Sequence, residues 1–154
     1  MAIHKFIAHL DWKKKTENEL KNNRKSVKNH QVTVKDKQPL LLSAAKSFKG
    51  DDQLYNPEDL LLSSLASCHM MSYLYCCSKY QIDVINYTDN AEAVLEVNPD
   101  GSGKIIQAIL NPIVTIRDEK HLKQAINLHQ EARQLCFIAN SCNFEILHFP
   151  IIIL

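Results

Sequence analysis

The sequence predicts an α+β protein in which two different helices are set between short strands. Three observations predict it: the first third alternates like β-structure, a long central run is helical and apolar, and a later helical run is amphipathic. The predicted order is three strands, a helix, two strands, a helix and a final strand. Because 154 residues are the length of one ordinary domain, we expect residues 1–154 to form a single domain.

The strands are predicted where apolar and polar residues alternate between turn residues. A long hairpin is expected in the second half, because Pro99, Asp100 and Gly101 make a turn between two strand-like runs. Pro150 marks the end of the last strand. The predicted strands are residues 2–10, 31–34, 40–43, 82–97, 104–116 and 143–149.

The two predicted helices differ in how completely they are buried. Asn56, Pro57, Glu58 and Asp59 form a strong helix start, because Asn caps, Pro fits the first turn and acids complement the helix dipole. This helix runs to about residue 80 and is apolar almost all round, so we expect it to be buried between the chain and a second subunit. The second helix opens at Asp118. Its predicted apolar stripe is Leu122, Ala125, Ile126, Ala132, Leu135 and Cys136.

The overall composition argues against several classes of partner. With 18 Lys and Arg against 17 Asp and Glu, the chain offers no general attraction for nucleic acid or an anionic membrane. The N-terminal residues have no continuous apolar run of the kind that an export signal needs, and no run approaches the ~20 residues of a membrane span. We therefore expect a cytoplasmic protein that binds neither nucleic acid nor membrane.

The cysteines are the first candidates for chemistry. Their number is odd, they contain no C-x-x-C pair, and two of them are adjacent, so neither a disulfide framework nor a zinc site is expected. Cys68 lies in the apolar helix, where a cysteine is ordinarily core filler, and it needs a nearby cation to become a thiolate. Glu58 precedes it by ten residues, ~15 Å along a helix, so the two side chains can cooperate only across a dimer. By itself, Glu58 is explained as an acid at the helix N-terminus.

Two segments resemble the OsmC/Ohr family of osmotically inducible and organic hydroperoxide resistance proteins. The segment from Asn56 to Cys68 is similar to the family's N-P-E-x-L-L…A-x-C pattern. Cys136, 68 residues later, lies in a segment similar to the family's A-x-x-x-C pattern, which in one branch continues as C-F-I-A-N-S. The resemblance implies an OsmC-like fold, an interlocked homodimer with its sites at the subunit interface, and a peroxidase that uses no metal, flavin or haem.

The resemblance also implies a role for each cysteine. Cys68 attacks the distal oxygen of a peroxide and becomes a sulfenic acid, and Cys136 condenses with it into a disulfide that an external dithiol of the dihydrolipoyl type reduces. Cys142 is the rival partner, and the motif favours Cys136. His69 follows Cys68 directly, but adjacent helical residues point about 100° apart, so we expect it to pack or hydrogen-bond elsewhere.

The activating cation is where the chain departs from the family pattern. Lys28 stands where many members have an arginine that holds the thiolate and pairs with the glutamate, and Arg24 is the only arginine before Glu58. Lysine supplies charge but not the forked contact to a carboxylate, so the cation is open between Lys28 and Arg24. This departure keeps a rival function open, a non-catalytic or weakly catalytic stress protein that binds a small apolar ligand. A thiol sensor coupled to a partner is a third class.

Overall fold

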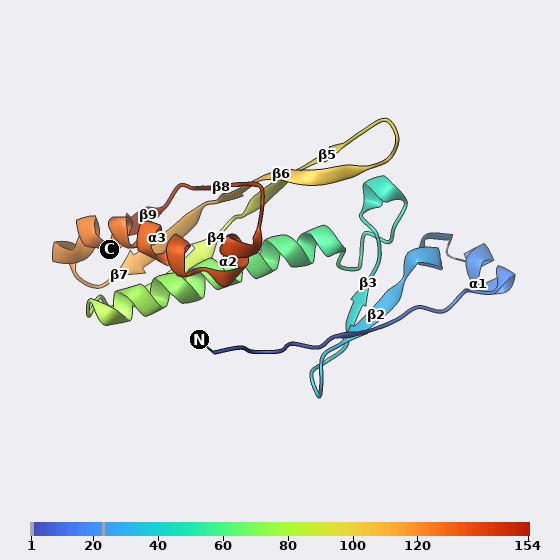
Figure 1. Cartoon of the computed structure of the whole chain (residues 1–154), viewed down its shortest axis with the longest axis horizontal. Coiled ribbons are helices and arrows are strands. Elements are labelled where there is room, and N and C mark those ends of the chain that lie inside the picture. Colours follow the sequence, from blue (N-terminus) through green and yellow to red (C-terminus); the bar gives the residue numbers. More distant parts are fainter. Residues whose placement is uncertain (1, 23) are drawn as a thin grey trace. The chain divides into compact units, whose positions relative to one another are not determined.

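The computed structural model describes residues 2–22 and 24–154, which form two compact units, Met1–Leu61 and Leu62–Leu154. The predicted fold class is confirmed, because helices and sheets are mixed along the chain (Figure 1). Whether the two units form the single domain that we expect stays a prediction.

The first unit contains a three-stranded antiparallel sheet in the order β1-β2-β3. Its strands are β1 (His9–Asp11), β2 (His30–Thr33) and β3 (Leu40–Leu42). The second and third agree with the predicted runs, whereas the first is much shorter than 2–10. Ile3 and Phe6 are 95% and 92% exposed, so the described residues do not bury the apolar positions of that run.

The first unit also contains short helices, two of them in the polar segment between β1 and β2, and none of them was predicted. It contains α1 (Glu17–Asn22) and the 3-10 helix η1 (Arg24–Lys28), and a second 3-10 helix, η2, spans Lys46–Phe48. Helix α1 starts with a reciprocal capping pair: the Thr16 backbone N–H donates to the Glu19 carboxylate at 2.7 Å, and the Glu19 N–H donates to the Thr16 hydroxyl at 3.4 Å. The pattern Thr-x-x-Glu was the available signal.

Helix α2 (Pro57–Lys79) confirms the predicted long helix and its start. Asn56 and Asp59 cap it reciprocally, since each accepts a hydrogen bond from the other's backbone N–H at 2.9 and 3.1 Å. Within one chain the helix is buried along one face, while Met71 and Tyr75 are 58% and 64% exposed. The expectation that no run approaches the length of a membrane span needs a correction, because by length and composition α2 could cross a membrane, a property shared by core helices of soluble proteins.

The second unit holds two three-stranded sheets, ordered β4-β7-β9 and β5-β6-β8. The predicted hairpin is present but divided, because β4 pairs with β7 and β5 pairs with β6. The division is fixed at Asn111, whose backbone N–H donates to the Asp89 carboxylate at 2.7 Å and whose side-chain amide donates to the Asn90 carbonyl at 3.0 Å. The strands are β4 (Val84–Asp89), β5 (Glu92–Val97), β6 (Gly103–Leu110), β7 (Pro112–Ile116), β8 (Glu145–His148) and β9 (Ile151–Ile153).

Strand β8 confirms the predicted last strand, but the chain continues into β9, which was not predicted. Pro150 lies in the link between them, where no strand hydrogen bond is required of it. Strand β9 then pairs in parallel with β7, so the two C-terminal strands extend different sheets.

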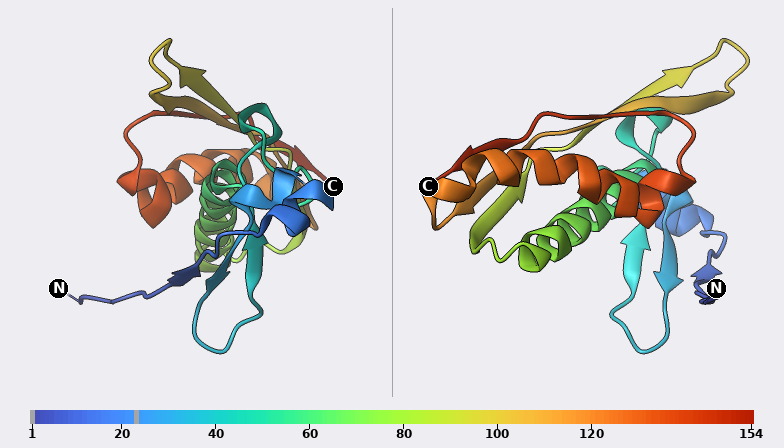
Figure 2. Two further views of the ribbon diagram at one scale, coloured as in Figure 1. Left: turned by 90° about the vertical axis from the view of Figure 1, so that its right-hand side faces the viewer. Right: turned by 60° about the vertical axis from the view of Figure 1, so that its left-hand side comes forward.

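The core lies between the sheets and the helices, which continue after β7 as the 3-10 helix η3 (Glu119–His121), α3 (Leu122–Leu135) and α4 (Phe137–Ser141). Helices α2 and α3 pack side by side against the β4-β7-β9 sheet (Figure 2). The predicted stripe of α3 is partly wrong, because Ile126 and Leu135 are exposed while Leu128 and His129 are buried. A second apolar cluster joins α2 and α4 to the β5-β6-β8 sheet and contains Cys68, Cys136 and Cys142.

Candidate functional site

Cys68 lies on α2 where this helix borders an apolar cavity of about 420 Å³. The side chain is half-buried, so its sulfur is part of the core cluster and of the cavity wall together. The residues lining the cavity come from α2, the end of α3 and the start of α4. They are Cys68, Met71, Ser72, Tyr75, Leu135 and Phe137.

Cys136 is fully buried at the junction between α3 and α4. It ends one helix and caps the next, because its Sγ accepts a hydrogen bond from the Ala139 backbone N–H at 3.4 Å. Its side chain also lies next to that of Cys68, in the same apolar cluster. The structure therefore brings together the two cysteines that the motifs single out, although they are 68 residues apart in the sequence.

The surroundings of Cys136 keep it protonated. Burial, followed by the neighbouring Cys68 thiol, raises the pKa of Cys136 to about 11. At neutral pH Cys136 is thus a thiol that can donate to the Cys68 sulfur. Cys142 belongs to the same cluster and burial raises its pKa, but among the described residues it is Cys136 whose pKa the neighbouring Cys68 thiol also raises.

Two buried histidines, His69 and His129, and the half-buried His148 form a cluster that begins next to Cys68 in the sequence, and sequence reasoning identified only His69. His69 Nε2 and His129 Nδ1 are 3.1 Å apart, in hydrogen-bond contact. The centroid of the His148 ring is 4.4 Å from that of His69, and the Tyr73 ring stacks on His129 at 3.9 Å. His69 therefore packs against other histidines. The spacing of Ala125, His129 and Ala132 on α3 was the signal that could have placed His129 on the buried stripe.

All three histidines are held neutral. Burial, with the neighbouring His148 and His129, lowers the pKa of His69 to about 3. Burial and His148 lower that of His129 to about 4, and burial with the Arg133 charge lowers that of His148 to about 4. In the described residues no group of three or more His, Cys, Asp or Glu side chains is arranged to hold a metal ion.

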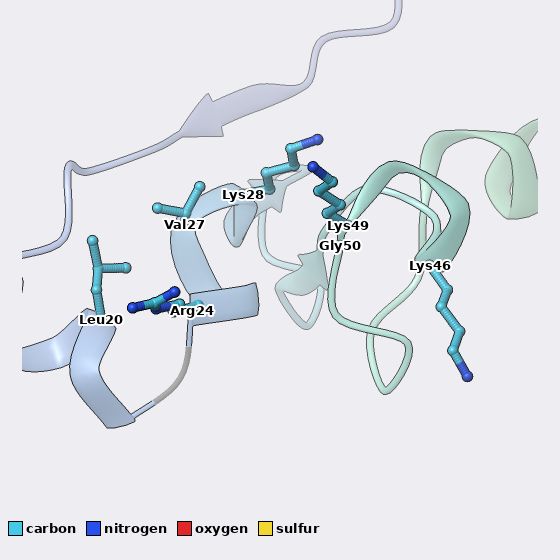
Figure 3. Close-up of a pocket in the computed structure, with 7 residues that line it drawn as sticks. All are labelled: Leu20, Arg24, Val27, Lys28, Lys46, Lys49 and Gly50. Atoms are coloured by element: carbon cyan, nitrogen blue, oxygen red, sulfur yellow. The ribbon is translucent and has the colours of Figure 1, made fainter.

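The two candidate cations of the first unit line one cavity of about 620 Å³ (Figure 3). Arg24 and Lys28 project from η1. The Lys28 amine donates to the Phe48 carbonyl, while Lys46 pairs with Asp52 at 3.4 Å. The full lining is Leu20, Arg24, Val27, Lys28, Lys46, Lys49 and Gly50.

Glu58 lies half-buried in the first turn of α2. It belongs to the first unit with Arg24 and Lys28, whereas Cys68 and Cys136 belong to the second. The predicted cooperation of Glu58 and one of the two cations with Cys68 stays a prediction.

Comparison with solved structures places this fold among known proteins. An OsmC-like protein of unknown function from Vibrio cholerae is 28% identical, with a TM-score of 0.85 over 97% of this chain and 100% of that chain. An organic hydroperoxide resistance protein, OsmC, from Legionella pneumophila is 17% identical, with a TM-score of 0.73 over all of both chains. The organic hydroperoxide resistance protein OhrB of Bacillus subtilis is 14% identical, with a TM-score of 0.63 over 98% of this chain and 99% of that chain.

The sequence itself was compared with curated proteins and with family models. No curated protein matches the chain. The model of OsmC-like proteins matches residues 50–147, a span that includes Glu58, Cys68 and Cys136. That span is more than half of the chain and contains both cysteine motifs. The chain therefore belongs to the OsmC-like protein family.

Proposed function

We propose that this protein is a cytoplasmic thiol peroxidase that reduces organic hydroperoxides in oxidative stress defence. The observation that carries the proposal is the neighbouring pair of thiols, Cys68 and Cys136, beside an apolar cavity. The names of its structural neighbours in Legionella and Bacillus, which are organic hydroperoxide resistance proteins, support the same class of substrate.

The reaction begins at the half-buried thiol. The Cys68 thiolate forms an S–O bond with the distal peroxide oxygen while the O–O bond breaks, and the proximal oxygen leaves as an alcohol after taking a proton. Cys136 then attacks the sulfenic sulfur, so that an S–S bond forms and the S–O bond breaks with release of water. Two thiol–disulfide exchanges with an external dithiol restore both thiols.

The burial of the two thiols supports this division of roles. Cys136 is fully buried and keeps its proton, so it is a poor first nucleophile, but its sulfur is already next to Cys68. Cys68 borders the cavity and is the sulfur that a substrate can reach. The apolar walls suit an alkyl or acyl hydroperoxide better than hydrogen peroxide, which we expect to be the poorer substrate.

We propose further that the active form is a homodimer. Met71 and Tyr75 on the cavity side of α2 are more than half exposed in one chain, and so are Ile3 and Phe6. Burial of such apolar groups favours association. In this arrangement either Lys28 or Arg24 supplies the cation for the Cys68 thiolate, and Glu58 pairs with that cation.

A second candidate is a non-catalytic stress protein that binds a small apolar ligand. It is favoured by one observation: among the described residues, none that lines the Cys68 cavity is a cation. Without a cation the thiolate is disfavoured in an apolar site, and the cavity becomes a ligand pocket.

One assay separates the two candidates. Reduced protein is mixed with cumene hydroperoxide or hydrogen peroxide and a dithiol, for wild type, Cys68→Ser, Cys136→Ser and the control Cys142→Ser, and turnover and disulfide formation are followed. Turnover that requires Cys68, with a disulfide mapped to Cys68 and Cys136, supports the peroxidase. A wild type without turnover on either peroxide contradicts it, and a Cys68–Cys142 disulfide contradicts the choice of the second cysteine.

A further inference from the structure

We propose that His69 and His129, supported by His148, are positioning residues that hold Cys68 and Cys136 within bonding distance of each other. The inference rests on the proposed redox use of the two thiols. It assigns a role to a buried polar cluster that the peroxide chemistry itself does not use.

The positions of the histidines in the two helices carry the argument. His69 follows Cys68 directly on α2, so any shift of His69 along or about the helix axis moves Cys68 with it. His129 lies on α3, seven residues before Cys136, which is the C-cap of that helix. The hydrogen bond of 3.1 Å between His69 Nε2 and His129 Nδ1 therefore joins the two thiol-bearing helices.

A second layer of contacts fixes the same pair of helices. Tyr73, one turn after His69, donates its hydroxyl proton to the Ala125 carbonyl of α3 at 3.1 Å. Its ring stacks on His129, and the His148 ring from β8 packs against His69. Both histidine rings of the bond are thus enclosed by other rings, which restricts their rotation.

As core packing alone, the histidine cluster is less stabilising than apolar side chains would be. His69 Nδ1, His129 Nε2 and His148 Nε2 are all buried, and none has a hydrogen-bond partner in the described part of the chain. Such groups are less stabilising than an apolar side chain of similar shape. The hydrogen bond gives what an apolar ring does not, a directional tie between α2 and α3.

The tie depends on the neutral form of the imidazoles. In a neutral pair one ring nitrogen donates and the other accepts, whereas two protonated rings present two donors and repel each other. The titratable groups that face the cluster are Tyr73 of α2, Arg133 of α3, the other histidines themselves and, next to Tyr73, Tyr87 of β4. The positive charge of Arg133 opposes protonation of His148.

The test uses substitutions that separate the shape of His69 from its hydrogen bond. His69→Leu fills similar space without the bond, and His69→Gln can place an amide atom near the position of Nε2. His4→Gln, at an exposed position, is the matched control. For each folded variant, the equilibrium between the dithiol and the Cys68–Cys136 disulfide is measured at pH 7 in oxidised and reduced dithiothreitol, with thermal unfolding of the reduced proteins as the stability control.

The expected result is a weaker disulfide without a matching loss of stability. His69→Leu should lower the equilibrium constant for disulfide formation by about tenfold, the effect of one lost buried hydrogen bond. His69→Gln should stay within about threefold of wild type, since it restores that bond. The wild-type constant should also fall below pH 5, in parallel with protonation of the cluster, whereas that of His69→Leu should vary less with pH.

An unchanged disulfide equilibrium in folded His69→Leu overturns the proposal, as does a loss of equal size in His69→Gln. These measurements need no peroxide. A wild type that forms the disulfide in dithiothreitol but reduces no hydroperoxide contradicts the proposed peroxidase while leaving the positioning role supported.

Discussion

Helix α2 carries cysteines in two regions, at Cys68 and at the adjacent Cys76 and Cys77, and their surroundings differ. Cys68 is half-buried, borders a cavity and lies next to the thiol of Cys136. Cys76 and Cys77 are almost completely buried in the core under α3. Burial raises the pKa of both, to about 11 for Cys77.

The comparison shows what a thiol needs beyond its presence on an apolar helix. Both regions provide sulfur in an apolar setting, which by itself favours the unreactive protonated form. Among the described residues, Cys68 is the cysteine of α2 that lines a cavity and also lies next to a thiol outside α2, that of Cys136. Cys77 also lines a cavity, of about 400 Å³, but its side chain is only 1% exposed. Exposure of the sulfur and a partner thiol, rather than composition or a cavity alone, distinguish a candidate redox site from core packing.

The largest expected effect comes from removing the accessible thiol. Cys68→Ser should lower hydroperoxide turnover at least about a thousandfold, because the oxygen of serine is a far weaker nucleophile toward peroxide. Turnover of cumene hydroperoxide with a dithiol is the measurement. Cys77→Ala is the control and should retain wild-type turnover. Equal losses in the two variants would remove the distinction between the two regions.

The next effect concerns the partner thiol. Cys136→Ser should allow one rapid reaction with peroxide and then stall, with multiple turnover reduced by about a hundredfold, because no thiol is left to attack the sulfenic acid. The trapped Cys68 sulfenic acid can be measured by mass spectrometry as its dimedone adduct. Cys142→Ser should form the disulfide normally. Stalling in Cys142→Ser instead would identify Cys142 as the partner.

Between the two cysteine regions, α2 carries His69, whose cluster should make stability depend on pH. The pKa of each histidine is lower in the folded chain than the usual 6.5, so unfolding takes up protons in acid. The stabilisation is complete above about pH 6.5 and is lost as pH falls toward 4.

Between pH 7.5 and pH 5 we expect a loss of about 2 kcal/mol of unfolding free energy for each buried histidine that titrates in this way. Urea unfolding at the two pH values measures it. His148→Phe should reduce the pH dependence, and His4→Gln, at an exposed position, should leave it unchanged. An equal dependence in wild type and His148→Phe would show that His148 does not contribute.

The sequence predicted the elements whose signals are local. Asn56, Pro57 and the acids after them define the start of α2 by capping, and Pro99 to Gly101 define a turn, so both appear where expected. Strand β9 and the break at Asn111 were not predicted, because they depend on pairing with distant strands. The short β1 has the same cause, since alternation without a facing layer does not bury a strand.

The site was predictable only in part, for a similar reason. The motifs singled out Cys68 and Cys136, and the structure places the two side chains next to each other, while their roles stay a prediction. His129 and His148 were not predicted, because the sequence around a histidine in a helix or a strand does not identify the side chain that it contacts. Their meeting with His69 depends on how α2, α3 and β8 pack, which no spacing in the sequence reveals.

The smallest expected effect tests whether Cys77 is only core packing. Cys77→Ala removes one sulfur from a cluster of tightly packed side chains that includes Tyr73, Val114 and Leu128. Loss of its buried contacts and the small cavity left behind should reduce the unfolding free energy by about 1 kcal/mol. Peroxide turnover, the dimedone adduct of Cys68 and the Cys68–Cys136 disulfide should all be as in wild type. If Cys77→Ala slowed disulfide formation without a loss of stability, the thiols of the second region would take part in the redox chemistry. The two cysteine regions of α2 would then differ only in how much each contributes to it.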